Sequence, residues 1–352
     1  MKEVLILQNK ILHYNKPLYN YLAKKYKVTV LHSGNISKFK DDIYNELIVN
    51  TTNIGPFIFQ HKVISEVRSL KYDVVIAMFD IKWVNNILAM YFKNKQTRFV
   101  WWGMGFGKNS IANKIRIYLS KKSNSIVLYT KNAQEVFEKN GLNKNKLFVA
   151  NNTFHIEKRE KAYLNLEKNI LLFVGSLDRR KENEKLIIAF SHIVNNINKD
   201  IKLVFIGNGQ EKINLIELVS SLRLENRVLF KGKITDTDEL KNYYKLAIAS
   251  VSFGQAGLSV LQSLGYGVPF ITKKNAVSGG EIFNIVDTHN GILCEDSIIS
   301  LEDSLKEVCN NIEKSKLMGE KAYIYYNQYC TIQNMVQGFV NAIECKENKN
   351  EF

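Results

Sequence analysis

The chain has 352 residues, of which 45% are hydrophobic and 24% charged, a balance typical of a folded globular protein. This length exceeds what one hydrophobic core usually serves and predicts two domains. No apolar run reaches the roughly 18 residues that a membrane span needs, and no signal-peptide pattern is visible, so we expect a cytoplasmic protein. The four cysteines are too far apart in sequence for a common metal or redox motif, and we interpret them as reduced thiols.

The net charge of +15 is distributed unevenly along the chain. Residues 1–152 contain 24 Lys and Arg against 9 Asp and Glu, whereas residues 153–352 contain 25 against 25. The whole excess therefore lies in the N-terminal half. A one-sided positive field suits an anionic partner, which could be nucleic acid, an acidic membrane face or a phosphate-bearing molecule.

Short apolar runs alternate with longer amphipathic stretches in the first half of the chain. This pattern predicts parallel strands joined by crossover helices. The predicted helices include Pro17–Lys25 and Asn132–Asn140. The predicted strands are Val4–Gln8, Val28–His32, Asp73–Met78, Arg98–Trp102, Ile126–Tyr129 and Leu147–Ala150.

The alternation stops after Asn152 and restarts at Ile170, which predicts a domain boundary. Each half is then one doubly wound α/β sheet with Rossmann-like order. The later strands are predicted at Ile170–Gly175, Leu203–Gly207, Val228–Gly232, Ile248–Ser252, Pro269–Thr272 and Ile292–Cys294. The predicted parts are an N-terminal domain (1–153), a charged linker (154–168), a C-terminal domain (169–330), and a helix and tail (331–352) that can pack back towards the N-terminal domain.

A glycine-rich turn follows the strand that ends at Ser252. A helix is predicted to begin near Gly257, so the backbone N–H groups of Gly257, Leu258 and Ser259 can point at an anion. This arrangement would bind phosphate without a metal. The alternative is purely structural, because any tight strand-to-helix turn favours glycine, and for the turn alone both interpretations are equally good.

A second candidate segment is Val174–Lys181, where Arg179, Arg180 and Lys181 lie in a loop. This loop follows the first strand of the C-terminal domain, at the edge of an open parallel sheet where ligands bind. A lone basic turn is more often a solvated surface feature. Its occurrence in the same domain as the glycine turn favours a phosphate site.

Together these segments resemble glycosyltransferase family 4, whose members are retaining enzymes of GT-B architecture, with two Rossmann-like domains facing across a cleft. The resemblance spans about residues 147–330 and includes Leu203–Gly209, Arg227–Gly232, Gly279–Glu281 and Asn290-Gly291 in family order. It implies transfer of a hexosyl-type residue from a nucleotide diphosphate sugar to a cell-surface glycan or a polyprenyl-linked acceptor. It implies no metal and no cofactor besides this co-substrate.

The resemblance also assigns a donor-binding set. Lys181 matches the lysine that pairs with the donor diphosphate, and the backbone of Ile234 matches a contact to the nucleotide base. The full set is Ser176, Arg179, Arg180, Lys181, Gly209, Ile234, Gly254, Gly257, Leu258, Ser259, Gln262 and Glu281.

Three members of this set depart from the family pattern. Ser176 stands where the family often has an arginine, so either Arg179 or Arg180 reaches the diphosphate or the donor affinity is modest. Gly254 and Gln262 align with the family's paired glutamates. Gln262 can still form hydrogen bonds with ribose hydroxyls, but Gly254 cannot replace a carboxylate, which affects the choice of sugar or the activity itself.

The catalytic residues are less well indicated. The segment Gly103-Met104-Gly105 lacks the histidine that family members often place near the reacting centre. A retaining front-face transfer can dispense with it, because the departing phosphate can accept the acceptor's proton. His13 and Asp80, at the carboxyl ends of first-domain strands, are the candidate polar groups, although either alone could be structural. We interpret Asp236-Thr237-Asp238, which imitates a metal-binding Asp-x-Asp motif, as a helix N-cap.

The segment Asn109–Lys122 has apolar residues at helical spacing among basic ones. Such a helix could lie on an anionic membrane surface. The alternative is an ordinary surface helix that packs by its apolar stripe.

Two other function classes stay open. One is a nucleotide-sugar epimerase on the same two-domain plan, which would need an acid and a base. The other is a donor-binding subunit that has lost catalysis, suggested by Gly254 and Met104. Nucleic-acid binding has no support beyond positive charge.

Overall fold

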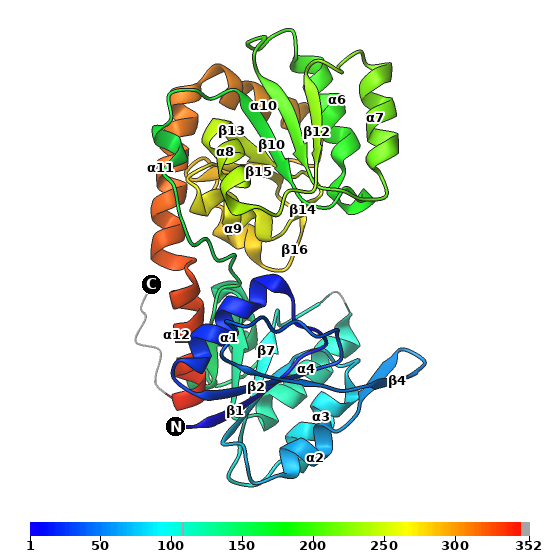
Figure 1. The fold of residues 1–352 in the computed structure, drawn as a ribbon, viewed down its shortest axis with the longest axis vertical. Helices are drawn as coiled ribbons and strands as arrows, with labels where there is room; N and C mark the ends of the chain where they lie inside the picture. Colours follow the sequence, from blue (N-terminus) through cyan, green and yellow to red (C-terminus); the bar gives the residue numbers. More distant parts are fainter. Residues whose placement is uncertain (108, 346–352) are drawn as a thin grey trace. The chain divides into compact units, whose positions relative to one another are not determined.

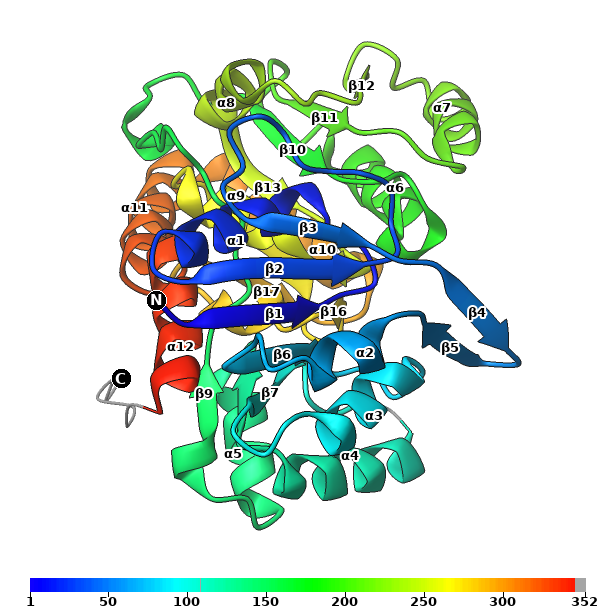
Figure 2. The ribbon, with the colours of Figure 1, turned by 60° about the horizontal axis from the view of Figure 1, so that its bottom comes forward.

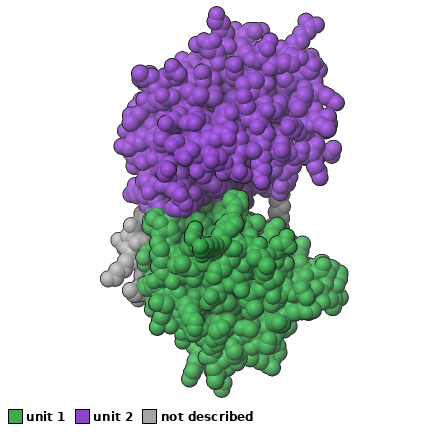
Figure 3. Space-filling view, viewed as in Figure 1, with its two compact units in different colours: residues 1–153, 332–352 green, residues 154–331 purple. Residues whose placement is uncertain are grey.

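The computed structural model describes residues 1–107 and 109–345, which form two compact units (Figure 3). Unit 1 comprises residues 1–153 and the C-terminal helix that starts at Ile332, and unit 2 is Phe154–Thr331. Part of the predicted C-terminal tail, residues 346–352, lies outside the described residues.

In the described part of unit 1, the main sheet has seven parallel strands in the order β3-β2-β1-β6-β7-β8-β9 (Figure 2). Its central strands are apolar runs buried on both faces, and Val4, Leu5, Ile6 and Leu7 of β1 have no exposed surface. The bounds are β1 (Glu3–Leu7), β2 (Lys27–His32), β3 (Asn45–Ile48), β6 (Val74–Met78), β7 (Arg98–Gly103), β8 (Ser125–Leu128) and β9 (Leu147–Val149).

Helices cover both faces of this sheet. On one face, α1 (Lys16–Ala23) packs beside α12 (Ile332–Glu344), which also contacts β8 and β9. The other face is covered by α2 (Val63–Arg68), α3 (Val84–Phe92), α4 (Ser110–Lys122) and α5 (Lys131–Lys139). Short 3-10 turns, η1 (His13–Asn15) and η2 (Lys144–Lys146), complete the unit.

The sequence pattern did not predict three strands of unit 1. These are β3 and the antiparallel hairpin of β4 (Thr51–Ile54) and β5 (Phe57–Gln60). Each has only four residues and a mostly exposed or half-exposed surface, so none carries the long apolar run that marks the buried strands. Gly55 at the hairpin turn has a φ of +55°, a conformation that favours glycine.

Unit 2 is a second doubly wound domain (Figure 1). In its described residues, the main sheet has the order β12-β11-β10-β13-β15-β17, and all of its pairs are parallel. The strands are β10 (Ile170–Val174), β11 (Lys202–Ile206), β12 (Val228–Gly232), β13 (Ala247–Val251), β15 (Phe270–Lys273) and β17 (Gly291–Cys294). A small sheet pairs β14 (Gln255–Ala256) with β16 (Val277–Ser278).

The helices of unit 2 also form two layers. One layer contains α6 (Asn183–Ile193), α7 (Lys212–Ser221) and α10 (Ile298–Asn310). The other contains α8 (Thr237–Leu246), α9 (Leu258–Gly265) and α11 (Ile312–Tyr329). No helix in the described ranges has the length and apolar character needed to span a bilayer.

The strand order of unit 2 reverses between β10 and β13, which lie side by side in the middle of the sheet. After β10 the chain continues to β11 on one side of this pair, and after β13 it continues to β15 on the other side. In doubly wound sheets, ligands bind at the carboxyl ends of the strands at such a switch point. Both candidate segments of the sequence, Val174–Lys181 and the turn after Ser252, follow these two strands.

The charged stretch 154–168 is not a separate linker, which corrects the sequence interpretation. Ile156 and Ala162 are buried in unit 2, and the backbone N–H of Ala162 donates to the carbonyl of Tyr266 at 3.0 Å. The charged residues between them hid this anchoring, because apolar residues are few in the segment. At its end, buried Lys168 donates from Nζ to the carbonyl oxygen of Ala247 at 2.9 Å.

Lys168 makes the stability of unit 2 dependent on pH. Burial, with a smaller effect of the Lys316 charge, lowers the pKa of Lys168 to about 7. At pH 6.5 the ammonium is charged in both states, and its burial costs stability. Between pH 7 and about 10.4, the folded lysine is neutral while the unfolded one stays charged, so this cost declines as pH rises.

Lys168→Met is therefore expected to raise the melting temperature at pH 6.5 by roughly 2–4 °C, equivalent to about 1 kcal/mol. At pH 10 the variant is expected to be less stable than wild type, because the hydrogen bond to Ala247 is lost without a compensating gain. Thermal unfolding of both proteins at the two pH values checks this change of sign. An equal difference at both pH values would contradict it.

Candidate functional site

The loops that follow β10 and β13 are joined by one backbone hydrogen bond. The N–H of Gly254 donates to the carbonyl oxygen of Lys181 at 3.0 Å. A Cβ atom on residue 254 would lie 2.4 Å from the carbonyl oxygen of Arg180 and 2.8 Å from Cγ of Glu182. Only glycine fits here without movement of the backbone. The side-chain space of position 254 is filled by the turn of residues 179–182, which explains why this chain has no glutamate there.

Lys181 is buried at this junction, with only 7% of its surface exposed. Its ammonium group packs near Gly175 and forms no hydrogen bond or ion pair with any residue that the structure describes. Burial lowers the pKa of Lys181, an effect that the Asp178 carboxylate opposes most strongly and that the Glu281 carboxylate also opposes. A buried cation of this kind is costly unless it is paired, so its surroundings favour an anionic ligand.

A cluster of ion pairs anchors the turn that carries Lys181. Glu182 has a left-handed backbone with a φ of 51°, which is unusual for a residue with a side chain. Its Oε1 atom lies 2.7 Å from Nζ of Lys273, a buried residue that also pairs with Asp296 at 3.0 Å. Oε2 pairs with Lys185 at 2.8 Å. The sequence pattern did not indicate the pair of Glu182 and Lys273, because the two residues are 91 positions apart.

The two arginines beside Lys181 do not reach the buried site, so of the two alternatives the structure leaves the prediction of modest donor affinity. Arg179 is 88% exposed and pairs with Glu211 at 3.1 Å, and Arg180 pairs with Asp178 at 3.0 Å. Ser176 is also engaged, since its Oγ donates to Asp178 at 2.7 Å. Nearby carboxylates thus bind these side chains at the surface.

The N-terminus of α9 lies in the same region, after the glycine turn. Gly257 is its N-cap, and a Cβ atom placed there would meet no atom within 4 Å. Within the described ranges, the backbone N–H groups of Leu258 and Ser259 have no acceptor, and the buried Oγ of Ser259 has no partner. Free N–H groups beside an open space are the arrangement that the predicted anion site requires.

Two further polar residues lie near this turn. Glu281 is 5% exposed, and its Oε2 accepts hydrogen bonds from the N–H of Gly279 at 2.8 Å and from Oγ of Ser278 at 3.1 Å. Gln262, on α9, is 6% exposed, and its amide forms no hydrogen bond with the part of the chain that the structure describes. Glu281 thus shapes the loop before η5 (Glu281–Asn284), while the Gln262 amide is available to a ligand.

The remaining predicted contacts have clear structural roles. A Cβ on Gly209 would lie 2.1 Å from the carbonyl oxygen of Leu177, so this glycine allows the loops after β10 and β11 to pack closely. Ile234 is half-buried and packs against the core on the α8 and α9 face. Asp236 caps α8 by accepting the N–H of Glu239 at 2.7 Å, which confirms the interpretation of Asp236-Thr237-Asp238 as a helix N-cap.

The catalytic candidates lie in unit 1 at the carboxyl ends of neighbouring strands. His13 is exposed in η1 after β1, with its ring edge-on to Tyr14. Asp80 follows β6, and its Oδ1 accepts the N–H of Lys82 at 3.0 Å, which closes a local turn. Met104 is 51% exposed in the loop after β7. These positions share one sheet edge.

Residues 155–325 match the family described as "Glycosyl transferases group 1". A curated relative is N-acetyl-alpha-D-glucosaminyl L-malate synthase of Bacillus anthracis, 30% identical over 47% of this chain and 42% of its own length. Another is the N-acetylgalactosamine-N,N'-diacetylbacillosaminyl-diphospho-undecaprenol 4-alpha-N-acetylgalactosaminyltransferase of Campylobacter jejuni, 27% identical over 61% of this chain and 59% of its own. The chain thus spans less than two thirds of each of these relatives.

Among solved structures, the Anabaena protein HepE in complex with UDP has the same fold, with a TM-score of 0.77 at 16% identity. The match covers 98% of this chain and all of that one. The two-domain GT-B fold class predicted from the sequence is confirmed, as is the resemblance to family 4 glycosyltransferases. The match to the group 1 glycosyltransferase family lies within unit 2.

Substitutions of Gly254 and Gly257 are expected to have different effects, the first on the stability of the fold and the second on nucleotide binding. Gly254→Ala is expected to destabilise the chain by about 1–3 kcal/mol, because the methyl group would clash with the backbone of Arg180. Gly257→Val is expected to cost at most about 1 kcal/mol, a helix-cap effect, since open space surrounds residue 257. The valine is nevertheless expected to weaken binding of a nucleoside diphosphate by roughly tenfold or more, about 1.4 kcal/mol.

Thermal unfolding and calorimetric titration of the two variants check this contrast. A Gly257→Val protein that binds the nucleotide as tightly as wild type would place the phosphates elsewhere.

Proposed function

We propose that this chain, whose residues 155–325 match the group 1 glycosyltransferase family, transfers a sugar from a nucleotide diphosphate sugar to a glycan or a lipid-linked acceptor. The observation that carries the proposal is the pairing of two phosphate-binding elements at the switch point of unit 2. The buried cation of Lys181 and the open N-terminus of α9 are tied together through Gly254. The two phosphate groups of a diphosphate are anions that the Lys181 ammonium and the α9 N–H groups can bind together.

The choice of substrates is supported by the relatives and by the charge of unit 1. The HepE structure contains UDP, and the name of the Campylobacter enzyme describes a diphospho-undecaprenol acceptor. We propose that unit 1, which contains nearly all of the positive excess, binds a phosphate-bearing acceptor. The choice of transferred sugar is expected to depend on position 254, where the family's glutamate is replaced by Gly254.

We propose a transfer with retention of anomeric configuration. A departing diphosphate held by Lys181 and the α9 N–H groups could accept the acceptor's proton, so no side-chain base is required. His13 or Asp80 could assist by orienting the acceptor hydroxyl. The anomeric configuration of the product, measured by NMR, tests retention.

An epimerase or a donor-binding subunit without catalysis is the competing function. The lack of a carboxylate at Gly254 favours the binding subunit over the epimerase. Analysis of the reaction products distinguishes the transferase, the epimerase and the binding subunit. Transfer or release of nucleotide supports the enzyme, interconverted sugar nucleotides support an epimerase, and binding alone supports the subunit.

We further propose that the protein works at the cytoplasmic face of a membrane, which it contacts through α4. Ile111, Ile115 and Tyr118 of this helix are 70%, 40% and 55% exposed, whereas Leu119 is 3% exposed and packs in the core, so most of the apolar stripe faces solvent. The basic residues around it are Lys114, Arg116, Lys121 and Lys122. An exposed apolar stripe flanked by cations suits an anionic lipid surface.

Lys181→Ala is expected to raise the dissociation constant of a nucleoside diphosphate at least about tenfold, because the buried cation is lost. Arg180→Ala is the matched control. It removes the same charge from the adjacent residue, but from an exposed side chain already paired with Asp178, and is expected to change affinity less than about twofold. Gln262→Ala is expected to fall between them, since water can partly replace neutral hydrogen bonds.

Calorimetric titration of the three variants gives this order. Unchanged binding by Lys181→Ala, with binding abolished in Gln262→Ala, would overturn the placement of the diphosphate.

Turnover is expected to be independent of divalent metal, because Lys181 and backbone N–H groups supply the positive field at the phosphates. The assay is sugar transfer, or donor hydrolysis in the absence of acceptor, before and after treatment with EDTA. Retained activity is the expected result. Loss of activity with EDTA, restored by manganese or magnesium, would contradict the proposal.

A further inference from the structure

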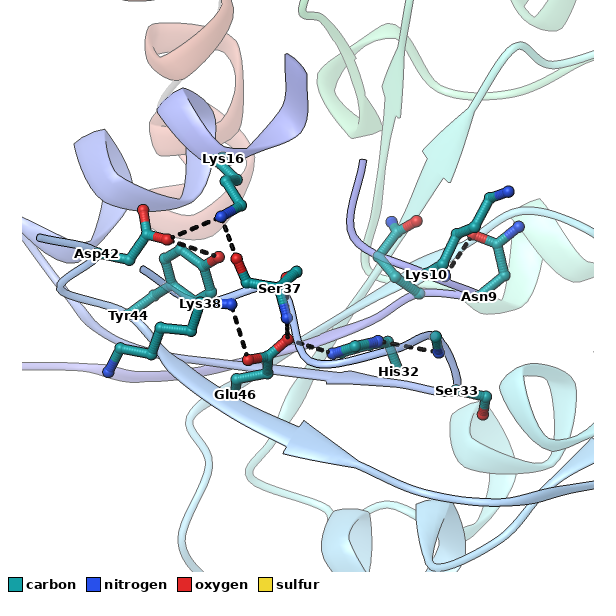
Figure 4. Close-up of polar contacts among 12 residues, drawn as sticks. Asn9, Lys10, Lys16, His32, Ser33, Ser37, Lys38, Asp42, Tyr44 and Glu46 are labelled. Carbon is teal, nitrogen blue, oxygen red and sulfur yellow. Dashed lines mark hydrogen bonds and ion pairs between the residues drawn. The ribbon is translucent and has the colours of Figure 1, made fainter. Parts of the chain in front are cut away.

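The connection between β2 and β3 is a loop rather than a helix. Parallel strands are usually joined by a crossover helix, but residues 33–44 contain no regular element. Long irregular connections inside compact domains are uncommon and are often functional. This one is held in place by two half-buried or buried carboxylates, those of Glu46 and Asp42 (Figure 4).

Glu46 binds the first part of the loop. Its Oε1 accepts hydrogen bonds from the backbone N–H and from Oγ of Ser37, each at 2.9 Å, and its Oε2 accepts the N–H of Lys38 at 3.1 Å (Figure 4). His32, which has no exposed surface, lies 2.8 Å from the same Oε1. Because Nδ1 of His32 accepts the N–H of Gly34, Nε2 carries the hydrogen and donates it to Glu46.

Asp42 binds the second part. It accepts the N–H of Phe39 at 2.8 Å and pairs with buried Lys16 at 3.1 Å. Nζ of Lys16 also donates to the carbonyl oxygen of Ser37 and lies 3.4 Å from the centre of the Phe39 ring. Hydrogen bonds to the two carboxylates therefore fix the backbone of residues 37–39 in the middle of the loop, and the ion pair of Asp42 with Lys16 ties this part to α1.

The same loop exposes large apolar side chains. Ile36, Phe39 and Ile43 are 80%, 71% and 56% exposed. Exposed Lys38 and Lys40 alternate with them along the sequence. A polar network that orders the backbone while leaving three large apolar groups in water has no evident use in folding the domain. It is the composition of a segment that contacts an interface between water and lipid.

We infer that residues 33–43 form a second lipid-contact site of unit 1, whose partner is the surface of an anionic phospholipid bilayer. Ile36, Phe39 and Ile43 enter the boundary between headgroups and acyl chains, and Lys38 and Lys40 bind lipid phosphates. An anionic bilayer is the expected partner because residues 1–152 carry the whole net positive charge of +15. Because the network already orders the loop, little conformational entropy is lost on binding. The inference rests on the proposed membrane association of unit 1.

The test uses the full chain and sedimentation with vesicles of phosphatidylglycerol and phosphatidylcholine in equal parts. The triple variant Ile36→Ser/Phe39→Ser/Ile43→Ser is expected to bind these vesicles at least roughly tenfold more weakly. The matched control is Ile54→Ser/Phe57→Ser in the β4–β5 hairpin, where the side chains are 62% and 47% exposed. The control is expected to bind like wild type. Ile36→Ser alone keeps the test valid if the triple variant does not fold.

Three further measurements distinguish a failure of the loop site from a failure of the α4 contact or of the donor site. Reversal of Lys114, Arg116, Lys121 and Lys122 tests α4 alone; if this abolishes binding while the loop variants bind like wild type, the second site is wrong. Loss of a dimer in the triple variant, with vesicle binding unchanged, would instead make the loop a contact between copies. Titration of a nucleoside diphosphate without vesicles tests the proposed donor site independently, and the loop variants are expected to leave that affinity unchanged.

Discussion

The hydrogen bond from Gly254 to the carbonyl oxygen of Lys181 is the contact on which the proposed site depends. It joins two loops that leave the sheet of unit 2 on either side of its switch point. Through it, a buried lysine and the open N-terminus of α9 form one region, although about 75 residues separate them in sequence. Without this contact, each would be an ordinary feature: a basic turn and a helix end.

The absence of a glutamate at position 254 follows from the same contact. The turn of residues 179–182 approaches Gly254 too closely for any side chain, and Glu182 lies where such a side chain would point. Glu182 keeps its left-handed backbone because Lys273 and Lys185 bind its carboxylate. The departure from the family pattern is therefore part of a coherent local packing arrangement.

The sequence predicted what depends on apolar periodicity and chain order. The buried strands, the two Rossmann-like domains and the loops after β10 and β13 were identified in this way. It did not predict the short exposed strands β3, β4 and β5, the anchoring of residues 154–168, or the pairing of Arg179 and Arg180 with carboxylates. The strands and residues 154–168 carry few buried apolar side chains. The pairing of an exposed arginine with one nearby carboxylate, such as Arg180 with Asp178, leaves no periodic pattern in the sequence.

In the proposed site, the diphosphate of a sugar nucleotide binds between Lys181 and the first turn of α9. A crystal structure of the full chain with a bound nucleoside diphosphate tests this placement. Phosphate oxygens are expected within about 3.2 Å of Nζ of Lys181 and of the backbone N–H groups of Leu258 and Ser259. A diphosphate bound instead by Arg179 and Arg180 at the surface, with Lys181 still without a partner, would contradict it.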